Sequence, residues 1–171
     1  AEALDEFPDM NFNIDAKSEE VALPLLEVIH EHDALGRVLV ASFDESRLRR
    51  LRRLEPRLVT SLGVGAVTRL VAASQLAQPA RRLLVPGPLE GVWAVQVPEK
   101  MGVFWVGARR FVATAHALGC AVHVWTVNEE EQMHRLLDLG VDGIITDYPT
   151  RARKVLEERG QWYPIAPANA E

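Results

Sequence analysis

Cysteine is almost absent from the sequence, and several other features that would narrow its function are missing. The single cysteine, Cys120, excludes an internal disulfide framework and a metal site built from several cysteines. A lone cysteine beside a strand-like segment is typical of a small buried apolar residue. No apolar run approaches the roughly 20 residues that a membrane-spanning helix needs. No GxGxxG motif follows a strand-like segment, so dinucleotide binding lacks its usual support.

Excess positive charge is also missing. The 171 residues include 24 Asp and Glu against 19 Lys and Arg, a formal net charge of −5. This balance argues against a nucleic-acid partner and against an acidic membrane surface. Five of the arginines fall in "ESRLRRLRRL", where the leucines share one helical face, and we interpret these arginines as the solvated side of that helix.

Short β-rich segments alternate with helical patterns along the chain. Several of these segments are nearly continuous apolar runs, as expected for parallel strands covered on both faces. Helix signals follow: Asp44 precedes one helical pattern, and Asn128 precedes another with Glu131 as its capping partner. The strand candidates, in order, are "FNIDAK", "RVLVASF", "RLVTSL", "GVWAVQVP", "AVHVWTV" and "VDGIITD".

Six β/α units in one order predict an α/β fold with a parallel sheet and right-handed crossovers. A doubly wound sheet and a barrel both fit this order. The spacing favours a TIM-type (β/α)8 barrel, of which about six of the eight units are present. We expect one barrel domain over residues 1–160, incomplete at its N-terminus, and a flexible tail over 161–171. Residues 75–91, rich in Pro and Gly, read as a long loop.

The stretch "NFNIDAK" interleaves apolar and polar residues. In a strand, Phe12 and Ile14 would share one face, while Asn13, Asp15 and Lys17 would share the other. The polar face could be a solvated ion pair between Asp15 and Lys17. It could also be part of an active site, because barrel chemistry gathers where the strands end.

Weaker site candidates lie on the other strands. Ser42 ends one strand, Gln96 is a lone polar residue in an apolar strand, and Asp147 precedes the last helix, which it is expected to cap. His123 is the one histidine on a strand and lies near its start, away from the expected catalytic end. The other four histidines fall in helical patterns and are expected at the surface; they are His30, His32, His116 and His134.

Four segments, each at the end of a strand, carry a resemblance to a known family. "FNIDAK", "ASF", "VHVWTVN" and "GVDGIITDYP" occur in this order and together resemble the glycerophosphodiester phosphodiesterase family, from about Leu4 to Trp162. The most specific combination is "FNI-acid-x-Lys", then "WTVN" and then "GIITD-x-P". The resemblance implies a β/α barrel that hydrolyses glycerophosphodiesters to glycerol 3-phosphate and an alcohol, with a divalent metal such as Ca²⁺ or Mg²⁺.

The resemblance also implies roles for three residues. Asp15 corresponds to a metal ligand, Lys17 to the phosphate contact, and Trp125 to an aromatic residue that borders the substrate pocket. The family more often has glutamate at the position of Asp15, so this carboxylate has a shorter reach.

The sequence departs from the family ahead of "FNIDAK". There the family has catalytic histidines, in "His-Arg-Gly" and "His-Asp", and a "Glu-x-Asp" metal pair, and residues 1–11 contain none of these. We therefore expect no catalytic residue within this chain and little or no activity from it alone. We also expect self-association through unpaired barrel edges.

Two other functions fit the residues. The chain could be a non-catalytic module that binds a phosphate or phosphodiester through Lys17. It could also be a different barrel enzyme, such as an aldolase with Lys17 as a Schiff-base nucleophile.

Overall fold

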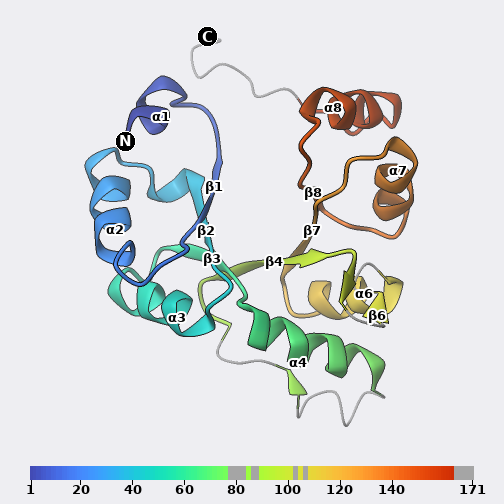
Figure 1. Cartoon of the computed structure of the whole chain (residues 1–171), viewed down its shortest axis with the longest axis horizontal. Coiled ribbons are helices and arrows are strands. Elements are labelled where there is room, and N and C mark those ends of the chain that lie inside the picture. Colours follow the sequence, from blue (N-terminus) through green and yellow to red (C-terminus); the bar gives the residue numbers. More distant parts are fainter. Residues whose placement is uncertain (77–83, 86–88, 102–103, 106–107, 164–171) are drawn as a thin grey trace. The chain divides into compact units, whose positions relative to one another are not determined.

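A computed structural model describes residues 1–76, 84–85, 89–101, 104–105 and 108–163 (Figure 1). The chain divides into two compact units. The first contains Ala1–Val64 and Glu90–Val92, and the second contains Gly65–Leu89 and Trp93–Trp162. Most of the expected tail and half or more of the expected loop over 75–91 lie outside the described residues. Within the described ranges, no helix has the length and apolar character to cross a membrane.

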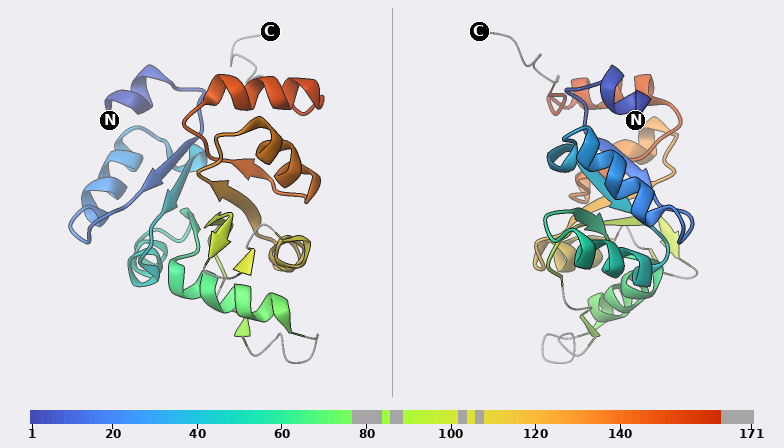
Figure 2. Two further views of the ribbon diagram at one scale, coloured as in Figure 1. Left: turned by 45° about the vertical axis from the view of Figure 1, so that its right-hand side comes forward. Right: turned by 90° about the vertical axis from the view of Figure 1, so that its left-hand side faces the viewer.

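The first unit is a layer of three parallel strands packed against helices (Figure 2). The strands lie side by side in chain order, with Ile14 beside Val40 and Val40 beside Thr60. The elements are α1 (Glu2–Glu6), β1 (Phe12–Asp15), α2 (Ala22–Glu31), the 3₁₀ helix η1 (Leu35–Arg37), β2 (Val38–Ala41), α3 (Glu45–Leu54) and β3 (Val59–Ser61).

Local sequence signals account for these elements. The four residues of β2 are all buried, as its continuous apolar run predicts. In β1, Phe12 and Ile14 are half-buried against the core, while Asn13 and Asp15 are exposed. This confirms the predicted alternation. Asp44 caps α3, because its Oδ1 accepts a hydrogen bond from the backbone N–H of Ser46 at 2.8 Å. These contacts confirm the predicted strands and the predicted cap.

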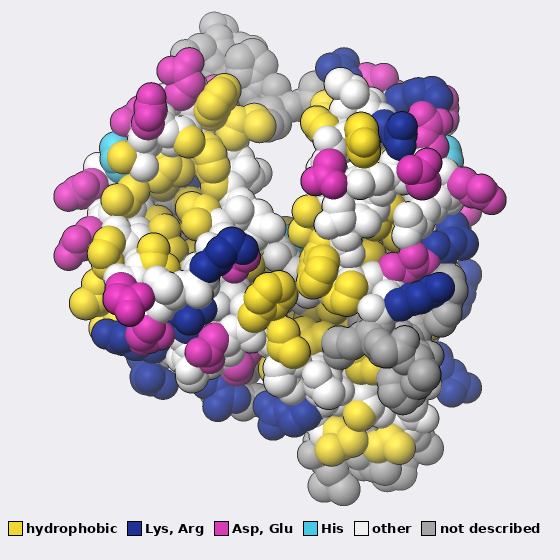
Figure 3. Space-filling model, in the orientation of Figure 1, with side chains coloured by type: hydrophobic (Ala, Val, Ile, Leu, Met, Phe, Trp, Pro, Cys, Tyr) yellow, Lys and Arg dark blue, Asp and Glu magenta, His cyan; other side chains and the backbone are white. Residues whose placement is uncertain are grey.

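Four of the five arginines of α3 form ion pairs with nearby carboxylates. Arg47 and Arg50 form ion pairs with Glu19, and Arg49 and Arg52 form them with Glu45. On the face shown in Figure 3, acidic and basic side chains lie beside one another over the first unit. The interpretation of these residues as a solvated face holds in part, because the side chains of Arg47 and Arg52 are only 12% and 9% exposed.

The second unit also has three parallel strands, in the order β4-β7-β8, and each is covered by helices (Figures 1 and 2). The helix α4 was not predicted from the sequence, because it is apolar on most sides and lacks a polar start signal. The short β5-β6 pair was not predicted either. The elements are α4 (Val64–Gln75), β4 (Val92–Pro98), β5 (Lys100–Met101), β6 (Phe104–Trp105), α6 (Arg109–His116), β7 (Ala121–Trp125), α7 (Glu130–Asp138), β8 (Gly143–Ile144) and α8 (Pro149–Glu158).

A row of three residues crosses these strands in register. Gln96 of β4 lies beside His123 of β7, which lies beside Gly143 of β8. The Gln96 amide nitrogen is 3.4 Å from Nδ1 of His123, and the ring of Trp93 meets the imidazole edge-on at 5.7 Å between centroids. Burial holds the pKa of His123 below its ordinary value, and Asp142 opposes this shift. His123 is therefore packed between Gln96, Trp93 and Gly143.

Gly143 makes room for this imidazole. A Cβ atom added at residue 143 would lie 2.6 Å from Cδ2 of His123. We predict that Gly143→Ala destabilises the protein by about 1–3 kcal/mol, because the ring is held from its other sides. Urea unfolding measures this, with Gly36→Ala as the control, since a Cβ at residue 36 meets nothing within 4 Å. Adding His123→Ala should relieve the cost of Gly143→Ala. Equal stability of Gly143→Ala and Gly36→Ala would contradict this account.

Glu55, which follows α3, is the carboxylate with the most strongly shifted pKa in the first unit. Hydrogen bonds from the Arg57 side chain at 3.1 Å and from the Arg57 backbone N–H at 3.0 Å lower the pKa of Glu55 from 4.5 to about 2. Nε2 of His30 lies 3.1 Å from the same carboxylate, so His30 is a paired surface residue.

This shift predicts a pH-dependent stability. A carboxylate with a depressed pKa in the folded state stabilises the fold above its unfolded pKa, and this contribution is lost as the pH falls from 4.5 towards 2. Glu55→Gln should lower the thermal midpoint at pH 7, and the difference from the wild type should shrink across that window. Glu27→Gln, at an exposed position of α2, is the control. A difference that stays constant from pH 7 to pH 2 would refute the role of the charge.

Candidate functional site

The end of β1 presents the two charged residues that the sequence singled out. Nζ of Lys17 donates a hydrogen bond to Oδ2 of Asp15 at 2.7 Å. The Lys17 side chain is 79% exposed and that of Asp15 is 39% exposed. An exposed ion pair of this kind contributes at most about 1 kcal/mol. Both groups can therefore exchange partners at little cost, the ammonium for an anion and the carboxylate for a cation.

The backbone between these two residues is held from behind. The carbonyl oxygen of Ala16 accepts hydrogen bonds from Oγ of Ser42 at 2.9 Å and from the Arg47 guanidinium at 2.8 Å. The same guanidinium donates to Ser42 at 2.7 Å. Ser42, a weak candidate from the sequence, is buried and faces this carbonyl, so it supports the segment that carries Asp15 and Lys17. Sequence periodicity could not identify Arg47, because its long side chain reaches past its own helical face.

A divalent cation needs more oxygen ligands than the described residues supply here. Calcium takes six to eight oxygen ligands, and Asp15 offers one carboxylate. Among the described residues, no group of three or more His, Cys, Asp and Glu side chains could hold a metal ion. The donor set around Asp15 is therefore incomplete for such an ion within the described residues.

Trp125 is the last residue of β7 and belongs to the second unit. It lies beside Pro98 in the register of β4 and is partly exposed. The structure thus brings Asp15 and Lys17 together in the first unit, whereas Trp125 belongs to the second unit. The segment after Trp125 is bonded to the segment after β8, where the backbone N–H of Val127 donates to the carbonyl of Ile145 at 3.0 Å.

Two capping interpretations from the sequence are wrong. The residue before α7 is Glu129 and the residue before α8 is Tyr148, and neither makes a side-chain capping hydrogen bond. Asn128 and Asp147 instead bind each other, with Nδ2 of Asn128 donating to Oδ2 of Asp147 at 3.0 Å. Each of these side chains binds a residue 19 positions away in the sequence instead of the backbone at the start of the following helix.

The remaining histidines have structural partners. His32 and Asp33 form a His-Asp dipeptide, but they lie after "FNIDAK", at the end of α2, and the His32 side chain binds Asp5 at 2.6 Å. His116 binds Asp142 at 2.7 Å, and His134 lies 3.6 Å from a Glu158 carboxylate oxygen. The expectation that no catalytic histidine lies within the chain stays a prediction. Cys120 is free and buried, and burial raises the pKa of its thiol.

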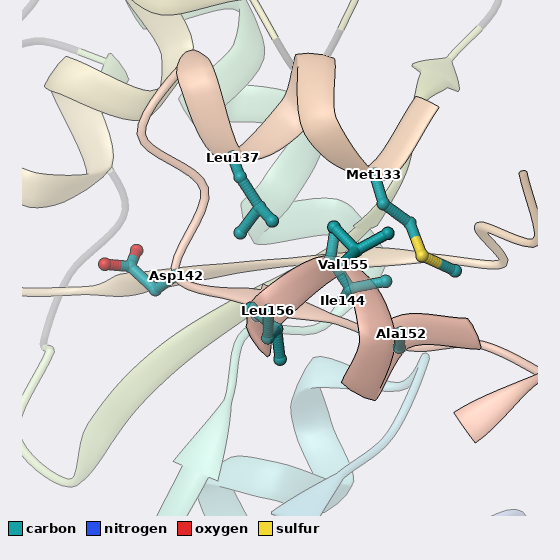
Figure 4. A pocket seen from close by; sticks show the side chains of 8 residues that line it. Met133, Leu137, Asp142, Ile144, Ala152, Val155 and Leu156 are labelled. Atoms are coloured by element: carbon teal, nitrogen blue, oxygen red, sulfur yellow. The ribbon is translucent and has the colours of Figure 1, made fainter. Parts of the chain in front are cut away.

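A crevice of about 120 Å³ lies between α7, α8 and β8. Figure 4 shows that Met133 and Leu137 of α7 and Val155 and Leu156 of α8 meet around Ile144, while the Asp142 carboxylate points away. An apolar lining of this kind offers no donor to a phosphate, so the crevice is a packing feature of the helix layer.

Comparisons with known proteins agree on one family. The model of the Glycerophosphoryl diester phosphodiesterase family matches residues 1–151. The chain is 41% identical over 160 residues to "Probable glycerophosphodiester phosphodiesterase 2" of Mycobacterium tuberculosis, covering 93% of this chain and 60% of that protein. It is 30% identical over 173 residues to the glycerophosphodiester phosphodiesterase of Bacillus subtilis, covering 90% and 52%.

A solved structure extends the likeness to the fold. The phosphodiesterase of Oleispira antarctica, in complex with the product sn-glycerol-3-phosphate, matches with a TM-score of 0.67 and 21% identity, over 91% of this chain and 58% of that one. The six parallel β/α units are thus of the β/α-barrel class, as the sequence predicted. The chain spans little more than half the length of the relatives it matches. It belongs to the glycerophosphoryl diester phosphodiesterase family.

Proposed function

We propose that the protein containing this chain hydrolyses glycerophosphodiesters to glycerol 3-phosphate and an alcohol. The observation that carries the proposal is the exposed, weakly paired Lys17 at the end of a parallel strand, in a chain of this family. Lys17 would meet the substrate phosphate as a point charge. Trp125 is proposed separately, within the second unit, as an aromatic residue that binds substrate. The product complex of the Oleispira antarctica phosphodiesterase supports a small phosphorylated glycerol as the ligand class.

Asp15 is proposed as one ligand of a divalent cation, Ca²⁺ or Mg²⁺. A carboxylate suits such hard cations, and the cation would neutralise charge on the phosphate when bound. Further ligands would have to come from outside the described residues. The proton transfers would also come from groups beyond this chain, since the family places its histidines ahead of "FNIDAK". We therefore propose that residues 1–171 provide the phosphate-binding part of the site.

The first test separates binding from hydrolysis. The chain should bind glycerol 3-phosphate in calorimetry, and Lys17→Ala should weaken this binding roughly ten- to hundredfold by removing a charge-assisted contact. Hydrolysis of glycerophosphocholine with Ca²⁺ or Mg²⁺ should be weak or undetectable. Lys154→Ala is the matched control, because Lys154 is an exposed lysine in the second unit that is paired with Glu130 at 2.7 Å.

The outcomes distinguish the alternatives. Robust hydrolysis that Lys17→Ala abolishes would show that the histidine motifs are not essential. Binding without hydrolysis in the full-length protein would favour a non-catalytic phosphodiester-binding module. Equal affinity of Lys17→Ala and Lys154→Ala for glycerol 3-phosphate would refute the phosphate role of Lys17.

The strands at the ends of the two layers also support a partner proposal. In the described residues, β1 pairs with β2 and β8 pairs with β7, and each has one parallel neighbour. A strand edge with free backbone groups pairs readily with another chain. The isolated chain should therefore form dimers or larger species at tens of micromolar in sedimentation velocity. A single monomeric species across that concentration range would overturn this proposal.

A further inference from the structure

The Asn128 side chain forms a hydrogen-bonded bridge between two loops of the second unit, the loop after β7 and the loop after β8. Its Oδ1 accepts hydrogen bonds from Oγ1 of Thr146 at 3.0 Å and from the backbone N–H of Asp147 at 3.1 Å. Its Nδ2 donates to the Asp147 carboxylate at 3.0 Å. One amide thereby makes three hydrogen bonds to the loop that follows β8.

The chemistry of the partners leaves one orientation for this amide. A backbone N–H can only donate, and an ionised carboxylate can only accept. The oxygen of Asn128 must therefore face the N–H of residue 147, and its nitrogen must face the carboxylate of the same residue. Asn128 and Asp147 therefore exchange two hydrogen bonds, one between their side chains and one from the backbone N–H of Asp147 to the Asn128 oxygen.

Other contacts tie the same two loops together. The Arg151 guanidinium donates to the carbonyl oxygen of Asn128 and lies 3.5 Å from a carboxylate oxygen of Glu129. The same guanidinium stacks over the ring of Tyr148, 4.6 Å from its centroid. Oγ1 of Thr146 accepts from the backbone N–H of Tyr148 at 3.0 Å. The first turn of α8 thus contributes to the bridge between the two loops.

The bridge between the two loops lies next to Trp125 in the chain. Asn128 follows Trp125 by three residues, and the pairing of β7 with β8 extends to Val124 beside Ile144. The chain that leaves Trp125 is therefore held by the contacts of residues 127 and 128 with the β8–α8 loop. A side chain holds its orientation best when the backbone on both sides of it is fixed. The strand pairing fixes the backbone up to Trp125, and the contacts of Val127 and Asn128 fix it after Trp125.

We propose that Asn128 and Asp147 are a positioning pair that holds Trp125 in its substrate-binding orientation. This inference rests on the proposed function for its ligand, a glycerol phosphate. It assigns Asp147 a hydrogen-bonding role toward Asn128 in place of the predicted helix cap. It also accounts for "WTVN" and "GIITDYP" as two halves of one contact.

The experiment exchanges the two side chains. Asn128→Asp alone brings two carboxylates together, and Asn128→Ala removes all three hydrogen bonds. The double variant Asn128→Asp with Asp147→Asn restores the pairing in reverse, because the new amide donates to the new carboxylate. The carboxylate at residue 128 still accepts from Thr146 and from the backbone N–H of residue 147. Rescue by the exchanged pair separates a specific contact from a general loss of stability.

The readout is the ¹⁹F NMR spectrum of the chain labelled with 5-fluorotryptophan. The four tryptophans give four signals, and Trp125→Phe identifies the one of interest. Asn128→Asp and Asn128→Ala should shift or broaden the Trp125 signal without ligand, and the exchanged pair should restore it. Affinity for glycerol 3-phosphate, measured by calorimetry, should fall about tenfold in the single variants and recover in the exchanged pair. Asn11→Asp, at an exposed position before β1, is the control for added charge.

The outcomes keep the two proposals apart. If the wild-type chain does not bind glycerol 3-phosphate, the proposed ligand fails, while the ligand-free spectra still decide whether the pair holds Trp125. If the single variants leave the Trp125 signal unchanged, or move all four signals together, the positioning role is overturned. If the signal moves but affinity does not, the pair is structural and plays no part in binding.

Discussion

Both units depend on a parallel strand that is bonded on its two sides. β2 lies between β1 and β3, and β7 lies between β4 and β8. A buried strand must pair its backbone N–H and C=O groups, because an unpaired group costs about as much as a lost hydrogen bond. Parallel pairing makes the strands of each unit end along the same edge. The loops that carry the candidate residues therefore meet in space within each unit, although they are far apart in sequence.

These loops contain backbone groups that no strand or helix satisfies, and polar side chains take over that role. In the first unit, Ser42 and Arg47 bind the carbonyl of Ala16 behind Lys17. In the second unit, the amide oxygen of Asn128 accepts hydrogen bonds from Thr146 and from the backbone N–H of Asp147, in the loop after β8. The exposed residues Asp15 and Lys17 remain available for a ligand, because Ser42 and Arg47 hold the backbone between them.

Much of the fold followed from the sequence, and so did part of the candidate site. The β-rich segments predicted the six strands, the Asp44 signal predicted the start of α3, and the alternation in "NFNIDAK" predicted which face of β1 is exposed. The motif order predicted the family, which the comparisons show. The helix α4 escaped prediction because its weakly contrasted faces carry little periodic signal. The roles assigned to Asp15, Lys17 and Trp125 stay predictions.

The sequence by itself determined what depends on residues close together along the chain: strand alternation, the Asp44 cap, and the pairing of Lys17 with Asp15 two residues away. Tertiary structure decided where a side chain has to choose between a local partner and a distant one. Asn128 resembles a helix cap, yet it binds a loop 19 residues further along. That choice depends on strand register, because only the pairing of β7 with β8 brings the donor and acceptor groups within hydrogen-bond distance.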